Sequence, residues 1–195
     1  MADPAPPGEG LLPEILAPDL DVIFVGAAPS VCAARSGHYY AGPRNRFWSL
    51  LWQAGLTPRL LRADEDSEVL RFGIGLTAIH PGLISTSNAL LPEPTEGQRE
   101  RLRARLVALA PSVVCYNGKD VYRMCTGAEA GAWGPLPERV GAARVFVAHS
   151  TSGRADRWGA DRLWLFGELR RLVEELRAER PGSPGARPAI QARDP

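Results

Sequence analysis

The residues best suited to chemistry in this chain gather in three polar stretches. His149 and Ser150 follow an apolar run in "VAHSTSG", Asn88 lies within "LISTSNALLPEP", and Tyr40 lies in "HYYAGPRNRFW". An imidazole can donate a hydrogen bond to a developing negative charge, and an aromatic ring can stack on a planar ligand. An asparagine amide offers a donor and an acceptor side by side, which suits the edge of a nucleobase. These residue types predict a site for a flat, polar molecule.

Each of these residues also has a purely structural interpretation. The tyrosines could pack beneath their own loop, Asn88 could form a turn, and a histidine at a strand end is more often structural than catalytic. In "GAAPS", Gly26 permits a sharp turn after a strand, and Ala27 and Ala28 leave room for a ligand near the backbone. An ordinary strand-to-helix junction explains that pattern equally well.

Several chemistries are excluded by missing motifs. The sequence contains no phosphate-binding GxxxxGK[ST], no GxGxxG and no GxSxG nucleophile motif. No two of the cysteines have CxxC spacing, so neither a zinc knuckle nor an iron–sulfur cluster is expected; they are Cys32, Cys115 and Cys125. The residue patterns therefore indicate neither of these metal sites.

Composition predicts one compact α/β domain. The chain has 195 residues, of which 45% are hydrophobic, and its formal net charge is +1. Stretches 1–18 and 180–195 are rich in Pro, Gly and Ala, so we expect flexible tails around a single domain at 19–179. No signal-peptide pattern and no apolar run of about 20 residues is present, so no membrane is expected and a reducing cytoplasm fits best.

Strand and helix patterns alternate along the domain. Strands are predicted at Asp21–Gly26, 72–79, 112–118 and from 143, and helices at 45–55, 95–110 and 161–180. Thr95 and Gln98 form a predicted capping box, and Gly55 a predicted helix end. This order predicts a central, mainly parallel sheet flanked by helices. The three polar loops, Gly26–Asn45, Ile79–Pro94 and His149–Asp156, then lie at the carboxyl ends of its strands, where such sheets bind ligands.

The same stretches together resemble a known family. "GAAPS…HYYAGPRNRFWSLLWQAGLTPRLL", "GIGLT", "VVCYNGKDVY" and "HSTSGRAD" are similar in order and spacing to motifs of the uracil-DNA glycosylase superfamily, most closely its mismatch-specific uracil/thymine-DNA glycosylase branch. The similarity covers Asp21–Leu176, and "GPRNRFW" is its most specific part. It implies a three-layer α/β/α sandwich and a monomeric DNA-repair enzyme without cofactor. Such enzymes flip a damaged base out of DNA and hydrolyse its N-glycosidic bond.

The resemblance also assigns roles to residues. Tyr40 would stack on the everted base, Asn88 would read its edge, and the backbone N–H groups of Ala27 and Ala28, after Gly26, would face uracil O2. Residues Ser150, Ser152 and Gly153 match the phosphate-contacting loop. Arg154 falls where the family inserts a side chain into the gap left by the base. Independently of the resemblance, Arg44 and Arg46, near a helix start, could hold a phosphate or could lie along the solvent face.

Two departures from the family pattern leave questions open. The family positions its nucleophilic water with Asn or Asp at the third residue of the first motif, which is Ala28 here. Asn88 is the first candidate to replace it, followed by Asn45. Alignment on Ser152 and Gly153 places Ser150 at the second-motif position, whereas a one-residue bulge would place His149 there.

The leading hypothesis is a DNA glycosylase that excises uracil, or another deaminated base, from double- or single-stranded DNA in the cytoplasm, where it would associate with the nucleoid. One alternative is a weakly active or non-catalytic lesion-binding protein on the same fold, suggested by Ala28. Another is an α/β enzyme that acts on a free nucleobase or nucleoside.

Overall fold

The structure is a computed structural model that describes residues 12–153 and 159–180. Within these residues, five strands form one sheet in the order β2-β1-β3-β5-β4. The strands are β1 (Val22–Gly26), β2 (Ile74–Ala78), β3 (Val113–Asn117), β4 (Gly134–Val140) and β5 (Ala143–Ala148). All neighbours pair in parallel except β4, which is antiparallel to β5. The predicted α/β class with a mainly parallel sheet is confirmed.

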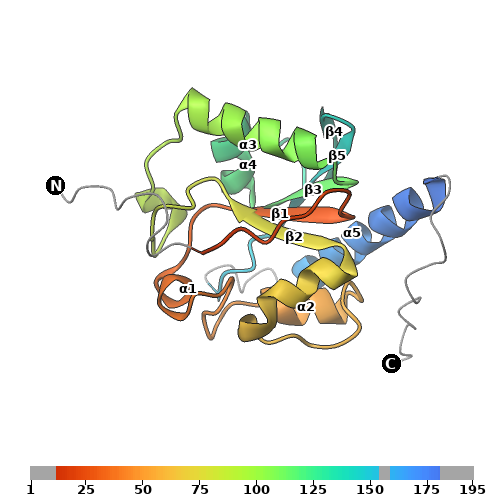
Figure 1. Cartoon of the computed structure of the whole chain (residues 1–195), viewed down its shortest axis with the longest axis horizontal. Helices are drawn as coiled ribbons and strands as arrows, with labels where there is room; N and C mark the ends of the chain where they lie inside the picture. Colours follow the sequence, from red (N-terminus) through yellow and green to blue (C-terminus); the bar gives the residue numbers. More distant parts are fainter. Residues whose placement is uncertain (1–11, 154–158, 181–195) are drawn as a thin grey trace.

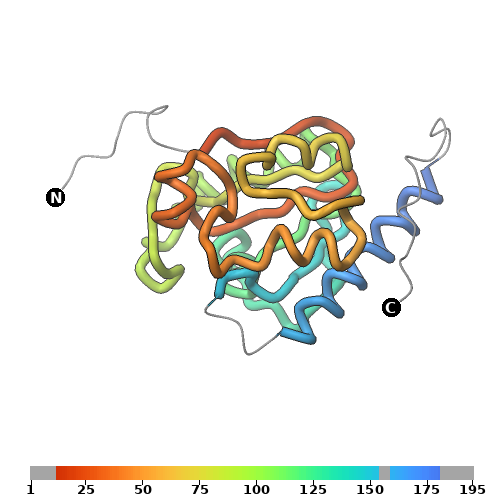
Figure 2. Tube along the Cα trace, turned by 90° about the horizontal axis from the view of Figure 1, so that it is seen from below, coloured from red at the N-terminus to blue at the C-terminus, as the bar shows by residue number. Residues whose placement is uncertain are grey.

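Helices cover both faces of the sheet and make the three-layer sandwich (Figures 1 and 2). They are α1 (Val31–Ser36), α2 (Phe47–Gln53), α3 (Glu96–Leu109), α4 (Lys119–Thr126) and α5 (Gly159–Glu179), with short 3₁₀ helices η1 (Ala63–Phe72) and η2 (Asn88–Leu90). Helices α3 and α4 pack on one face, and α2 and α5 pack on the other. The layers leave the strand ends, and so the loops that follow them, at one edge of the sandwich.

The interior strand β1 is apolar on both faces because helices cover both. On the α2 and α5 side, the Phe24 ring meets Phe47 edge-on at 5.1 Å between centroids and stacks on Phe166 at 5.8 Å. All three rings are fully buried. This cluster fixes the start of α2, and therefore the loop before it, against the sheet.

The predicted helix ends are confirmed where side-chain chemistry defines them. Thr95 caps α3, and the Gln98 side chain bonds back to the Thr95 N–H at 2.8 Å. Helix α2 ends at Gln53 with Ala54 as its C-cap, and Gly55 follows with a φ of 75°, a backbone region that favours glycine.

Five of the described elements were not predicted from the residue patterns, and they include helix α4 and the short helix η2. The loop Gly26–Asn45 contains α1, a six-residue helix capped by Ser30 and closed by Gly37 at a φ of 77°. The helix η1 was not predicted, because its sequence is mostly polar and its large apolar residues, Val69, Leu70 and Phe72, come only at its end. Strand β4, "GPLPERV", also escaped prediction, since its two prolines are tolerated only where a strand lies at a sheet edge.

Residues 12–18, assigned to a flexible tail by composition, lie beside β2. Ile15 pairs with Leu76 through two backbone hydrogen bonds of 3.0 and 2.8 Å, and both Leu12 and Ile15 are buried. Glu14 accepts a hydrogen bond from Thr77 and pairs with Arg105 of α3. The remaining predicted tail stretches, 1–11 and 181–195, lie outside the described residues.

No helix in the described part of the chain combines the length and the apolarity needed to cross a membrane.

Candidate functional site

A cleft of about 520 Å³ opens at the carboxyl ends of the strands. Strand β2 lies on one side of β1 and β3 lies on the other, so the order of the strands reverses at β1. Sheets of this kind bind their ligands at such a reversal point. The cleft is lined by all three predicted loops and by the junction between β3 and α4. The expectation that these loops converge is therefore confirmed.

Backbone hydrogen bonds join the loops to one another. The N–H groups of Ile79, His80 and Ser85 donate to the carbonyls of Gly26, Ala27 and Pro29, at 3.1, 2.9 and 3.1 Å. The Arg46 N–H donates to the Thr151 carbonyl at 2.9 Å, which ties the first loop to the third. The cleft walls are thus held by main-chain contacts that do not depend on a ligand.

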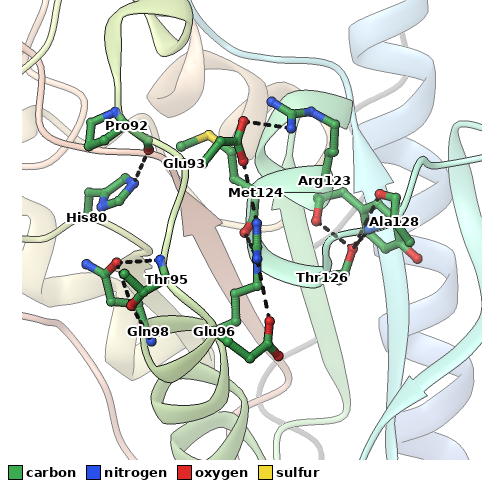
Figure 3. Close-up of polar contacts among 12 residues, drawn as sticks. His80, Pro92, Glu93, Thr95, Glu96, Gln98, Arg123, Met124, Thr126 and Ala128 are labelled. Atoms are coloured by element: carbon green, nitrogen blue, oxygen red, sulfur yellow. Dashed lines mark hydrogen bonds and ion pairs between the residues drawn. The ribbon is translucent and has the colours of Figure 1, made fainter.

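The far end of the second loop is anchored against α3 and α4 (Figure 3). His80 is 2% exposed, and its Nε2 lies 2.9 Å from the Pro92 carbonyl oxygen. Arg123 of α4 pairs with Glu93 at 2.7 Å, and Arg99 of α3 donates to the Met124 carbonyl at 2.9 Å. These bonds explain His80 as a structural histidine.

Tyr40 lies in the cleft wall in a constrained conformation. Its ring stacks on Phe47, with centroids 3.9 Å apart and planes 22° apart. Its backbone φ is 55°, a region that costs a non-glycine residue about 1–3 kcal/mol and recurs at functional sites. Burial raises the pKa of the Tyr40 phenol well above its ordinary value, although a hydrogen bond from Asn117 opposes this. The phenol therefore stays neutral.

Asn117 is a cleft residue that the sequence analysis did not single out. Its Nδ2 donates to Thr151 Oγ1 at 3.1 Å, and its Oδ1 accepts from the Thr151 N–H at 3.0 Å. Asn117 is 8% exposed and Thr151 is fully buried. The amide thus links the end of β3 to the third loop and to Tyr40. The sequence feature that could have identified Asn117 is its place at the end of an otherwise apolar strand.

Backbone and amide groups with spare hydrogen-bonding capacity face the cleft. Among the described residues, none accepts a hydrogen bond from the N–H of Ala27 or Ala28, and none bonds the Asn88 side chain. Asn45 differs, because its Oδ1 already accepts from the Phe47 N–H at 3.0 Å. The cleft therefore offers two main-chain donors and the Asn88 amide to a ligand.

His149 lies at another side of the cleft and is 4% exposed. Burial lowers the pKa of its imidazole; Asp161 acts against this, and Arg162 and Lys119 act with it. A neutral imidazole can still donate one N–H to an oxygen on which charge develops. The pairing of β3 with β5 runs without a bulge to Asn117 and Ala148, and both His149 and Ser150 line the cleft just beyond.

The third loop packs closely on the first. A Cβ added at Gly153 would lie 2.6 Å from the Arg44 Cβ and 2.9 Å from its carbonyl oxygen, so only glycine fits. The Ser152 N–H approaches Ser150 Oγ at 3.4 Å, and Arg162 of α5 donates to the Ser152 carbonyl at 2.9 Å. Gly153 thus has a packing role. Arg154, predicted to enter the DNA, lies outside the described residues.

Nothing in residues 12–153 and 159–180 gathers three or more His, Cys, Asp or Glu side chains into a group that could hold a metal ion. The residues that line the cleft offer backbone donors, amides, hydroxyls, an imidazole, aromatic rings and the charged side chains of Lys119 and Asp120.

Comparison with known proteins places this geometry in a family. A family model described as the uracil DNA glycosylase superfamily matches residues 13–174, which include every element of the cleft. The chain belongs to the uracil DNA glycosylase superfamily. The family part of the sequence prediction is thereby confirmed, together with DNA glycosylase chemistry as the activity of that family.

A solved structure agrees with the superfamily fold. It is the solution NMR structure of a Methanosarcina acetivorans protein named as a proposed uracil DNA glycosylase. The TM-score is 0.57 at 20% identity, and the match covers 84% of this chain and 97% of that chain. At this identity the likeness establishes the fold alone.

Proposed function

We propose that this member of the superfamily belongs to its mismatch-specific uracil/thymine-DNA glycosylase branch and excises uracil, or another deaminated base, from DNA. A single observation carries the proposal: one cleft at the strand ends brings together Tyr40, the Asn88 amide, His149 and two unused backbone donors. A planar base with carbonyl and N–H groups on its edge matches these groups.

The reaction is hydrolysis of the N-glycosidic bond. A water oxygen bonds to C1′ of the deoxyribose, the C1′–N bond breaks, and its electron pair leaves with the base. The N–H groups of Ala27 and Ala28, and a neutral His149 or Ser150, would stabilise the negative charge that spreads onto the base oxygens. The water's proton ends on the released base or in solvent, and an abasic sugar remains.

The aromatic wall would hold the everted base in place. Tyr40 already stacks on Phe47, so its ring is fixed before any base arrives. Base stacking on an aromatic ring is worth about 1–3 kcal/mol. Ser152 and Arg44, beside the cleft, are the proposed contacts to DNA phosphates.

An activity panel tests the proposal. Oligonucleotides with uracil, thymine, hypoxanthine or xanthine, in single and double strands, are incubated with the protein and then treated with alkali to cleave abasic sites. We expect cleavage at one or more deaminated bases. Tyr40→Ala should weaken lesion binding by about 5- to 150-fold, and Tyr40→Phe, which keeps the ring, should bind nearly as wild type.

Ala28 favours a second candidate function on the same cleft, since a methyl group cannot orient a water molecule. A non-catalytic protein of this kind would bind lesion duplex without any strand cleavage. If the folded protein neither cleaves nor binds any member of the panel, both functions are wrong, and an enzyme acting on free nucleobases or nucleosides becomes the better hypothesis.

A further inference from the structure

Trp133 lies beside His149 at the side of the cleft, just before β4. The centroids of the indole and imidazole rings are 4.0 Å apart, and their planes are tilted by 45°. The Lys119 Nζ lies 4.8 Å from the indole centroid. All three residues line the cleft, and Trp133 is 36% exposed while His149 is 4% exposed. The indole therefore packs against the imidazole and is the more exposed of the two rings.

A tryptophan at the rim of a DNA site would ordinarily be considered a stacking platform for a base. Here an imidazole and an ammonium group already contact the indole, which reduces the ring area left for a base. The contact with His149 is the better explanation of the position of Trp133.

We propose that Trp133 is a positioning residue that covers the imidazole of His149 and holds it, shielded from water, in one orientation toward the cleft. The catalytic meaning of this inference rests on the proposed function, in which His149 donates a hydrogen bond to the departing base.

Burial and nearby charges predict in which direction the pKa of His149 changes when the Trp133 indole is removed. Besides Trp133, the groups whose charges act on the His149 imidazole include Lys119 from α4 and Asp161 and Arg162 from α5. Burial is the largest of these influences, and it disfavours the imidazolium. Removing the indole lets water reach the ring and solvate its charged form. The pKa of His149 should then rise toward its ordinary value, and the ring should become protonated at a higher pH.

Nuclear magnetic resonance of ¹⁵N-histidine-labelled protein measures this directly. The chain has 3 histidines, so the spectrum is simple, and His149→Gln assigns the signal. Trp133→Ala and Trp133→Leu should each raise the pKa of His149, whereas Trp133→Phe, which keeps a ring over the imidazole, should stay near wild type. Trp52→Ala is the matched control, because Trp52 is 40% exposed and does not line the cleft.

The signals of His38 and His80 report whether each variant is folded. If Trp133→Ala unfolds, Trp133→Leu supplies the measurement, since leucine fills part of the space. An unchanged or lower pKa of His149 in the folded Ala or Leu variant, relative to the scatter set by Trp52→Ala, overturns the proposal.

An activity arm separates this inference from the proposed function. With an oligonucleotide that wild type cleaves, the acid limb of kcat/KM against pH should move to higher pH in Trp133→Leu and return in Trp133→Phe. If the pKa of His149 has risen but the acid limb of the pH profile does not move, Trp133 shields His149 without affecting the reaction. That outcome overturns the catalytic part of the proposal and leaves the shielding part confirmed. A wild type inactive on every substrate contradicts the proposed function and leaves the resonance result to decide the shielding.

Discussion

In the proposed reaction, the family resemblance assigns to Ala28 the position at which an amide or carboxylate would hold the water molecule, and a methyl group cannot do so. Two asparagines line the same cleft. The side-chain oxygen Oδ1 of Asn45 already accepts a hydrogen bond from the Phe47 N–H, whereas the Asn88 side chain makes no hydrogen bond with any described residue. Asn88 is therefore the better candidate to orient the nucleophile, and it also lies on a loop held at both ends.

Substitution of Asn88 is the corresponding test. Asn88→Ala should lower the single-turnover rate of base release on the order of 100-fold, as expected when one preorganised polar contact to the reacting groups is lost. Asn45→Ala is the matched control and should lose less. Ala28→Asn should change the rate much less than Asn88→Ala does. A large gain from Ala28→Asn would mean that the pocket still requires an amide at position 28.

At the scale of elements, the cleft depends on how β3, the first loop and the third loop meet. Asn117 bonds both the N–H and the hydroxyl of Thr151, and these groups are almost fully buried. Losing one partner leaves the other unsatisfied, which costs about 1–3 kcal/mol. This link should therefore govern both stability and the position of His149 and Ser150.

A double-mutant cycle measures the link. Asn117→Ala and Thr151→Val should each lower the free energy of unfolding in urea by about 1–3 kcal/mol. The double variant should lose less than the sum, with a coupling of about 0.5–3 kcal/mol. Strictly additive losses would mean that the two side chains stabilise the fold independently.

Close approach of two loops gives a second test at this scale. Gly153→Ala places a methyl group 2.6 Å from the Arg44 Cβ, so one loop must move. We expect a stability loss of about 1–3 kcal/mol and weaker binding to lesion duplex. Gly131→Ala, which meets nothing within 4 Å, should stay within about 0.5 kcal/mol of wild type. Thermal unfolding of both variants decides between packing and a purely phosphate-binding role for Gly153.

The elements with strong periodicity could be predicted from the sequence, and those set by tertiary contacts could not. Helix α2 buries its predicted face of Phe47, Leu50, Leu51 and Ala54. In contrast, β4 forms through its pairing with β5 at the edge of the sheet, where prolines are tolerated. Residues 12–18 are held in place through the backbone bonds between Ile15 and Leu76, which lies about sixty residues away in the sequence.

The same distinction applies to the site. Tyr40, Asn88, His149 and Ser150 could be placed around one cleft because strand ends of a parallel sheet share an edge. Trp133 could not be selected from sequence, because its importance depends on a contact with His149 across the fold. For Asn117 the only signal was its place at the end of an apolar strand, and its bonds to Thr151 could not be predicted from that.

At the scale of the whole molecule, charge is nearly balanced, with a net +1, so any DNA binding must come from local arrangement. Arg44 is exposed beside the cleft and has no ion-pair partner among the residues that the structure describes. Arg71, in contrast, pairs with Glu68 at 2.9 Å on η1.

Salt dependence of duplex binding tests this arrangement. The logarithm of the binding constant should fall linearly with the logarithm of salt concentration. Arg44→Ala should weaken binding and reduce that slope by about 1, as expected for one lost phosphate contact. Arg71→Ala should leave the slope unchanged. Binding that does not respond to salt would argue against phosphate contacts and for a small-molecule ligand.

Helix α5 spans the sandwich and makes side-chain contacts with other segments near both ends of the helix. Near one end Arg162 supports the Ser152 carbonyl, and near the other Arg177 pairs with Asp21 at 2.7 Å. Its Phe166 also completes the aromatic cluster beneath β1. During synthesis this helix is the last of the described elements to leave the ribosome. A nascent chain lacking α5 would have its strands but an unsupported third loop, so catalytic competence should appear only once translation has passed this helix.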